Sequence, residues 1–312
     1  MKQLLFRNGD IFPTLGLWTW LSRKIEVYDA VLEAVRLGYR HIDCAYIYQN
    51  EVEIGKALKF CFATGMVTRE ELFITSKLWN SDHAPERVEA AIRKSLSDLQ
   101  LEYLDLYLIH WPIAFKTGHE QAKDADDLLS LEEMPLEITW EAMEKVQELG
   151  LARHIGVSNF NIPKLKKLID MAKVKPEVNQ VELHPYFQQN ELVQFCQENG
   201  ILVTAFSPLG SRRLINEDDS IAKNDTILKI AEKHSCLPTE VILAWGMKRG
   251  TAVIPKSVNS TRIRDNYESI YVNLDEQDMM EIAKIDRNYR LAKGLYCVMP
   301  DGCYTLNSIW ID

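Results

Sequence analysis

The chain has 312 residues, of which 46% are hydrophobic and 26% charged, and its formal net charge is -9. This composition is typical of a soluble globular protein and argues against a disordered or fibrous chain. The 45 acidic residues outnumber the 36 basic ones, so we expect no nucleic-acid partner and no binding to an anionic membrane.

The N-terminal segment and the cysteines indicate the compartment. The first ten residues lack the apolar stretch of a signal peptide, and no apolar run approaches the roughly 20 residues of a membrane helix. The six cysteines are scattered without a C-x-x-C pair, which argues against a disulfide framework or a zinc site. We therefore expect a cytoplasmic protein with reduced thiols.

Strand-like and helix-like segments alternate after an opening hairpin turn at Gly9-Asp10. The first helix shows one apolar stripe between Val27 and Val35 and ends at Gly38. The strands are expected near residues 15–17 and at 39–43, 72–77, 104–110, 154–157, 178–181, 201–206 and 251–254. The later helices are expected at 50–64, 85–99, 139–149, 162–172, 190–199, 225–234 and 239–249.

Eight such strand-helix units predict a closed (β/α)8 barrel, also called a TIM barrel, rather than an open sheet. No linker rich in Pro, Gly or Ser divides the chain, so residues 1–312 are expected to form one domain. Residues 113–138 and 210–224 each follow a strand and are long enough to act as substrate loops. The tail at 286–312 is expected to fold back across the barrel mouth.

Motifs of other enzyme classes are missing from the sequence. There is no G-x-G-x-x-G dinucleotide fingerprint and no G-x-x-x-x-G-K-[ST] phosphate loop. The seven histidines include no H-E-x-x-H pair, and no G-x-S-x-G elbow is present. The sequence therefore predicts neither a Rossmann dehydrogenase, nor a metal site, nor a serine hydrolase.

Four polar residues fall where successive strands end: Asp43, Tyr48, Lys77 and His110. Each alone has a simpler structural explanation, but on a barrel all four point toward one mouth. A nearby lysine is expected to lower the pKa of Tyr48 toward working pH and make it a general acid, while Asp43 keeps the lysine charged. His110 would donate to the same substrate oxygen, so the set suits carbonyl reduction by hydride.

Five ordered segments carry a family resemblance: H-I-D-C-A-Y-I-Y-Q-N-E at 41–51, T-S-K-L-W at 75–79, L-I-H-W-P at 108–112, I-G-V-S-N-F at 155–160 and V-I-P-K-S at 253–257. Together they resemble the aldo-keto reductases over essentially the whole chain. The resemblance implies NADPH-dependent interconversion of aldehydes and alcohols. It also implies a catalytic tetrad of Asp43, Tyr48, Lys77 and His110, with Tyr48 as the proton donor.

The resemblance also implies a cofactor site. Ser158, Asn159 and Gln180 match the positions that bind the nicotinamide carboxamide, and Phe206 stands where the family usually stacks a tyrosine on that ring. The other matching positions, at the mouth, the pyrophosphate and the adenosine end, are Thr19, Ser207, Leu209, Lys256, Ser257, Val258, Asn259, Arg262 and Asn266. Lysine and arginine at the adenosine end favour NADPH, with NADH as an alternative.

Within the family, residues 110–116 look like xylose reductase, whereas 79–83, 173–176, 179–180 and 184–188 look like plant aldose-6-phosphate reductases such as those for sorbitol and mannose 6-phosphate. An aldose is therefore the expected substrate. The protein is expected to be a monomer or a homodimer. Phosphate-handling members tend to carry lysine where this chain has Gln49, which favours neutral sugars or general aldehydes. Lys116 is a second candidate cation for a phosphate.

The sequence also departs from the family opening G-T-W, because it reads Trp18-Thr19-Trp20. A ring at position 18 is expected to narrow the pocket or shift the cofactor. Trp20, Trp79 and Trp111 would line an aromatic mouth beside Gln49. Arg212 and Arg213 stand where an acidic residue would be expected to help fold a loop over the cofactor. The candidates to make that acidic contact, to Lys256, are Glu217, Asp218 and Asp219.

Two alternative functions stay open at this point. One is an aldose-6-phosphate reductase, which a comparison of a sugar with its 6-phosphate would distinguish. The other is a non-catalytic barrel, either a cofactor-sensing subunit of a membrane protein or a structural protein. The complete tetrad argues against the second alternative, because a non-catalytic protein needs no tuned tyrosine.

Overall fold

The computed structural model describes residues 4–210 and 220–311, which include a closed barrel of eight parallel strands. The strands, in their order around the barrel, are β3 (Leu17–Trp18), β4 (His41–Asp43), β5 (Phe73–Leu78), β6 (Leu104–Ile109), β9 (Ala152–Ser158), β10 (Val178–Glu182), β11 (Leu202–Phe206) and β12 (Ala252–Ile254). A parallel bridge between Leu15 and Val253 closes the ring, supported by a hydrogen bond of 2.9 Å from the Gly16 amide to the Val253 carbonyl. The predicted (β/α)8 barrel is confirmed.

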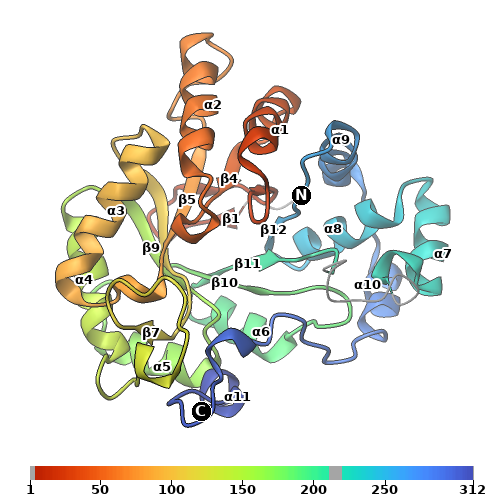
Figure 1. Ribbon diagram of the computed structural model, residues 1–312. Helices are drawn as coiled ribbons and strands as arrows, with labels where there is room; N and C mark the ends of the chain where they lie inside the picture. Colours follow the sequence, from red (N-terminus) through yellow and green to blue (C-terminus); the bar gives the residue numbers. More distant parts are fainter. Residues whose placement is uncertain (1–3, 211–219, 312) are drawn as a thin grey trace.

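Helices surround the strands on the outside of the barrel (Figure 1). They are α1 (Lys24–Leu37), α2 (Glu51–Ala63), α3 (Pro85–Leu99), α4 (Leu136–Glu148), α5 (Ile162–Met171), α6 (Asn190–Glu198), α7 (Asp225–His234), α8 (Pro238–Lys248), α9 (Ser260–Glu268), α10 (Glu276–Ala283) and α11 (Leu306–Trp310). Short 3-10 turns lie at Tyr46–Tyr48, Asn80–Asp82, Ala125–Asp127, Ile221–Lys223, Ser269–Tyr271 and Leu295–Cys297. The predicted helices are present, α3 and α7 with the predicted ends and the others with ends shifted by up to a few residues, whereas α9, α10 and α11 were not predicted. In α9 the buried residues are only Ile263 and Asn266, so its sequence has no apolar stripe to reveal it.

The N-terminal hairpin closes the bottom of the barrel. Strands β1 (Leu4–Leu5) and β2 (Ile11–Phe12) pair antiparallel around the predicted turn, where Gly9 adopts a φ of 92°. Phe6 and Phe12 pack with Phe73 against the side chains that fill this end of the barrel. This apolar plug leaves the opposite end, where the strands terminate, as the face for chemistry.

The loops and the tail form a wall at that opposite end. Residues 113–131 contain a small two-stranded sheet, β7 (Ala114–Phe115) with β8 (Leu128–Leu129). The Tyr304 hydroxyl donates to the Leu129 carbonyl at 2.6 Å and accepts from the Ala114 amide at 2.9 Å. The carboxylate of Glu182, at the end of β10, accepts the amides of Leu291 and Ala292 at 2.8 and 2.6 Å. The tail is thereby held against the mouth, as the sequence predicted.

Three further expectations concern segments away from the barrel strands. Across the described ranges, none of the helices combines the length and apolar character needed to span a bilayer. The six cysteines carry free thiols, and Cys303 is exposed. The contacts expected of Arg212, Arg213, Glu217, Asp218 and Asp219 lie outside the described residues.

The close packing of α2 on α3 depends on Gly55, and we expect Gly55→Ala to destabilise the fold. A Cβ atom there would overlap the carbonyl oxygen of Asp98 and lie 2.7 Å from the carbonyl carbon of Leu99. Because backbone atoms cannot rotate away, the overlap should cost about 1–3 kcal/mol, more than the roughly 1 kcal/mol that alanine gains within a helix. The midpoint of urea unfolding should fall for this variant, while Lys59→Ala on the exposed face of the same helix should change it little. An unchanged midpoint for Gly55→Ala would show that the two helices can separate freely.

Candidate active site

Parallel strand ends bring the four predicted catalytic residues to one place. Asp43 is the last residue of β4, Tyr48 ends the turn that follows it, and His110 directly follows β6. Lys77 lies at the end of β5, where it pairs in register with Leu108 of β6. Since every barrel strand runs in the same direction, these ends meet at one mouth.

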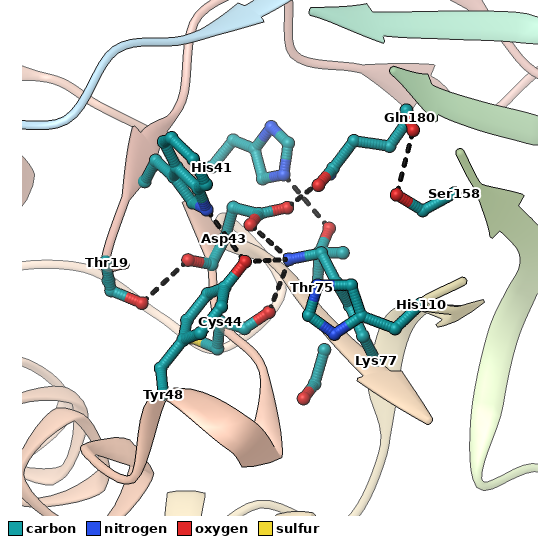
Figure 2. Close-up of polar contacts among 12 residues, drawn as sticks. Thr19, His41, Asp43, Cys44, Tyr48, Thr75, Lys77, His110, Ser158 and Gln180 are labelled. Atoms are coloured by element: carbon teal, nitrogen blue, oxygen red, sulfur yellow. Dashed lines mark hydrogen bonds and ion pairs between the residues drawn. The ribbon is translucent and has the colours of Figure 1, made fainter. Parts of the chain in front are cut away.

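The ammonium group of Lys77 forms the centre of the site (Figure 2). It donates to the carboxylate of Asp43, to the Cys44 carbonyl at 2.7 Å and to the Tyr48 hydroxyl at 3.3 Å. The second carboxylate oxygen of Asp43 accepts the Gln180 side-chain amide at 2.7 Å. Lys77 and Asp43 are both fully buried, so the three donors of the ammonium are matched by three acceptors.

Lys77 carries the positive charge of this cluster. Burial by itself lowers the pKa of Lys77, but the Asp43 carboxylate and the Tyr48 hydroxyl outweigh it, so the pKa lies above its ordinary value. The lysine is therefore protonated at neutral pH. This agrees with the expectation that Asp43 keeps the lysine charged and oriented.

The pKa of Tyr48 contradicts the sequence-based expectation of a lowered value. Burial raises the pKa of Tyr48 to about 12, although the Lys77 ammonium and the hydrogen bond from Trp18 act in the lowering direction. The expectation counted the charge of the lysine and missed the desolvation of the phenolate, which only the folded structure determines. Tyr48 is therefore a neutral phenol near pH 7, a form that can still give up a proton.

His110 is held as a neutral imidazole on the other side of Tyr48. Its ring lies 5.8 Å from the ring of Tyr48 and 5.1 Å from that of Trp79, both in edge-to-face arrangements. Burial lowers the pKa of His110 well below its ordinary value, and the Lys77 charge adds to this effect. A neutral imidazole carries one N–H group, so His110 can donate a single hydrogen bond into the mouth.

Three buried residues on and just after β9 and β10, Ser158, Asn159 and Gln180, form a polar cluster. The Ser158 hydroxyl donates to the Gln180 carbonyl at 2.8 Å, and the Asn159 side-chain amide donates to Ser158 and to the His110 carbonyl. The side-chain oxygen of Asn159 is buried and has no hydrogen-bond partner in the described parts of the chain. A buried acceptor without a donor suits a ligand that brings an N–H group, such as a carboxamide.

The predicted adenosine end lies between β12 and α9. Lys256, Ser257 and Val258 follow β12, and the side chain of Asn259 caps α9 by accepting the amide of Arg262 at 3.0 Å. Arg262 is exposed and Asn266 is buried on the same helix. Lys256 and Arg262 place two cations at the start of α9, so this end suits a phosphate group.

The other predicted cofactor positions lie on neighbouring strand ends. Ser207 and Leu209 follow β11, and the Thr19 hydroxyl donates to the Asp43 carbonyl at 2.8 Å.

An aromatic wall with one carboxylate stands at the mouth. The Trp79 indole donates to the Glu120 carbonyl oxygen at 2.7 Å, and its ring stacks on Tyr296 of the tail. The Glu120 carboxylate accepts the Tyr46 hydroxyl at 2.5 Å and the Gln49 amide at 3.3 Å. Trp111 packs edge-to-face against Tyr296. Tyr296 belongs to the tail that was expected to fold across the mouth, whereas Glu120 was not predicted, because its segment has no helix or strand periodicity.

Trp18 takes a place that the sequence only partly anticipated. Its indole N–H donates to the Tyr48 hydroxyl oxygen at 2.9 Å, and its ring stacks on Trp20 with centroids 4.9 Å apart. Trp18 pairs in register with Asp43 across β3 and β4, and this register could have indicated that the indole lies beside the tetrad. Trp18 is therefore in direct contact with the predicted proton donor, and its effect on the pocket and the cofactor stays a prediction.

The described residues also allow a search for metal-binding groups. Over residues 4–210 and 220–311, the structure contains no cluster of three or more histidine, cysteine, aspartate or glutamate side chains able to hold a metal ion.

Comparison with known proteins identifies the family. Residues 14–287 match the family described as the aldo/keto reductase family. The chain belongs to the aldo-keto reductase family. It is 46% identical to an aldo/keto reductase of Synechocystis sp., with 99% of this chain and 96% of that protein aligned. It is 45% identical to aldo-keto reductase family 1 member A1 of Gallus gallus, over 91% of this chain and 88% of that protein.

A solved structure supports the same assignment. The aldose reductase from Schistosoma japonicum superimposes with a TM-score of 0.88 at 39% identity, covering 95% of this chain and 96% of that chain. The chain is thus an oxidoreductase of this family. Relatives at this level of similarity include a family 1 member A1 protein and an aldose reductase, which corrects the predicted likeness to xylose reductases and plant aldose-6-phosphate reductases.

The raised pKa of Tyr48 can be measured directly. In protein labelled with carbon-13 at the tyrosine Cζ atom, we expect the Tyr48 signal to stay unshifted up to about pH 10.5, because its pKa lies near 12. Ordinary tyrosines titrate near pH 10 and provide an internal reference. The Tyr48→Phe variant assigns the signal by its loss. A Tyr48 signal that shifts between pH 7 and 9 would show that the lysine outweighs burial.

Proposed function

We propose that this aldo-keto reductase reduces an aldehyde, an aldose among them, to the alcohol with NADPH, and that Tyr48 donates the proton. The proposal rests on one observation above the others. A buried ammonium, Lys77, contacts the hydroxyl of a neutral tyrosine at the mouth of the barrel. When the phenol gives its proton to a substrate oxygen, the phenolate left behind faces that positive charge.

The residues around the mouth fit the nicotinamide dinucleotide that the family resemblance implies. Asn159 would accept the carboxamide N–H with its unpaired buried oxygen, beside Ser158 and Gln180. Lys256 and Arg262 would hold the phosphate on the adenosine ribose, which favours NADPH over NADH. When bound, the dihydronicotinamide supplies the hydride for the carbonyl carbon.

The side chains of this protein manage the proton and the oxygen charge. Tyr48 and His110 would both donate to the substrate oxygen, which polarises the carbonyl and stabilises the negative charge as it develops. Lys77 lowers the free energy of the tyrosinate, and Asp43 with Gln180 holds Lys77 in place. General acid catalysis of this kind contributes roughly 10²- to 10⁴-fold in rate.

The wall residues favour a neutral aldehyde over a sugar phosphate. Gln49, the position where a phosphate-binding lysine was considered, donates to the carboxylate of Glu120. A phosphate dianion at this point would be repelled by that carboxylate. Lys116, the second candidate cation, is exposed on the loop after β6. Trp20 is partly exposed and offers apolar surface for a sugar face or an apolar aldehyde, while Trp79 and Trp111 are buried behind the wall. A solved relative is an aldose reductase.

We expect Tyr48→Phe to remove aldehyde reduction. The loss in kcat should be at least about 10²-fold, because the proton donor is gone while the barrel is unchanged. NADPH oxidation followed at the nicotinamide absorbance measures the rate, and calorimetric titration should show NADPH binding no weaker than in the unmodified protein. An unaltered rate in this variant would remove Tyr48 from the mechanism.

Substrate selectivity tests the role of Gln49. With a panel of xylose, glucose, glucose 6-phosphate and an aromatic aldehyde, we expect kcat/KM to favour the uncharged compounds. Gln49→Lys should raise the ratio of glucose 6-phosphate to glucose by about three- to tenfold, the range of an exposed ion pair, while the neutral control Gln49→Met should not. A strong preference of the unmodified protein for the 6-phosphate would favour the aldose-6-phosphate alternative. Tight NADPH binding without turnover of any compound would favour a cofactor-sensing barrel.

A further inference from the structure

The indole of Trp18 contacts the Tyr48 hydroxyl, the group from which a substrate would receive its proton. Trp18 ends β3 and its side chain is buried among aromatic residues at the mouth. Its N–H donates to the Tyr48 oxygen at 2.9 Å, and Lys77 donates to the same oxygen at 3.3 Å. Both acceptor positions of the phenol oxygen are therefore taken, one of them by a group outside the tetrad.

The same indole occupies the space that a hydride donor needs. When a substrate carbonyl oxygen accepts a hydrogen bond from Tyr48, the carbonyl carbon lies one bond beyond that oxygen. The atom that carries the hydride must approach this carbon to roughly 3–3.5 Å. The hydride-bearing ring therefore has to lie within a few ångströms of the Tyr48 oxygen, which is where the Trp18 indole sits.

Phe206 forms the other side of this space. Its ring centroid is 5.6 Å from that of Trp18, at an interplanar angle of 39°. Neighbouring aromatic rings in proteins lie about 4.5–7 Å apart, so this gap is a direct contact and leaves no room for a third ring between them. The unpartnered side-chain oxygen of Asn159 suits a carboxamide, but a ring that carried this carboxamide to Tyr48 would have to displace Trp18.

We propose that Trp18 gates the nicotinamide half of the cofactor site. While the indole is hydrogen-bonded to Tyr48 and packed on Phe206, it excludes the nicotinamide ring. NADPH then occupies both halves of its site only when the indole moves away. This inference rests on the proposed function. The indole packs with Tyr48, Trp20, Phe206 and Ile254. The adenosine half of the site, at the start of α9, instead carries Lys256, Ser257 and Arg262.

The contacts of the indole favour the closed position. Opening the gate gives up the hydrogen bond to Tyr48, the stack on Trp20 and the contact with Phe206. The apparent dissociation constant of a ligand that needs the open form equals the intrinsic value divided by the open fraction. A glycine at position 18, as in the G-T-W opening, has no side chain to displace.

Calorimetric titration of two ligands separates the halves of the site. NADPH occupies both halves, whereas adenosine 2′,5′-bisphosphate occupies only the adenosine half. We expect Trp18→Gly to lower the dissociation constant for NADPH at least about tenfold, as for an open fraction of about one tenth. The dissociation constant for the bisphosphate should stay within about twofold. Trp310→Ala, which removes the indole that packs edge-to-face against Trp111 at 5.7 Å, should change neither value.

Trp18→Phe provides a second variant if Trp18→Gly does not fold, as judged by circular dichroism and the unfolding midpoint. It lacks the N–H that bonds to Tyr48 and has a smaller ring, so NADPH should bind about threefold or more tightly, again without a change for the bisphosphate.

The possible failures of this test are distinct. NADPH binding that is unchanged or weaker in both variants would overturn the gate and leave the proposed function standing. Equal tightening of NADPH and the bisphosphate would also overturn it, since the effect would then not be confined to the nicotinamide half. Failure of every form to bind either ligand would reject the proposed function together with the gate.

Discussion

The buried ion pair between Lys77 and Asp43 is the interaction on which the site depends. Placing two charges where neither contacts water carries a desolvation cost that only good hydrogen bonding offsets, and losing one partner of such a pair typically costs about 3–5 kcal/mol. Neighbouring groups satisfy the remaining hydrogen-bonding capacity of the pair. Lys77 donates to the Cys44 carbonyl and the Tyr48 hydroxyl, and Asp43 accepts the Gln180 amide. The strands that carry these groups must therefore be held in one fixed register, which the closed barrel provides.

Burial disfavours the charged form of each titratable group in the site, yet the site keeps a single cation at its centre. It disfavours the phenolate of Tyr48 and the imidazolium of His110, so both groups stay neutral and both carry a proton to donate. For Lys77 the same burial is outweighed by Asp43, so the ammonium persists. The result is a mouth in which two neutral donors flank one fixed positive charge, an arrangement suited to an oxygen that gains negative charge.

The two sides of Tyr48 differ in what they contact. On one side His110 and Trp79 lead to the wall formed by the tail and by the loop that carries Glu120. On the other side Trp18 and Phe206 meet directly. The hairpin that closes the opposite end of the barrel keeps that end apolar, so the polar strand ends gather at one face only.

Local patterns in the sequence determined the alternation of strands and helices, the barrel, and the meeting of Asp43, Tyr48, Lys77 and His110, because periodicity and strand direction are properties of neighbouring residues. The tertiary structure alone decided the raised pKa of Tyr48, since desolvation depends on atoms brought in from distant segments. It also decided the place of Glu120, on a segment without periodicity, and the bond from Trp18 to Tyr48. The sequence shows a bulky ring at position 18, but the direction of that ring follows from its packing against Phe206, which is close to it only in the fold.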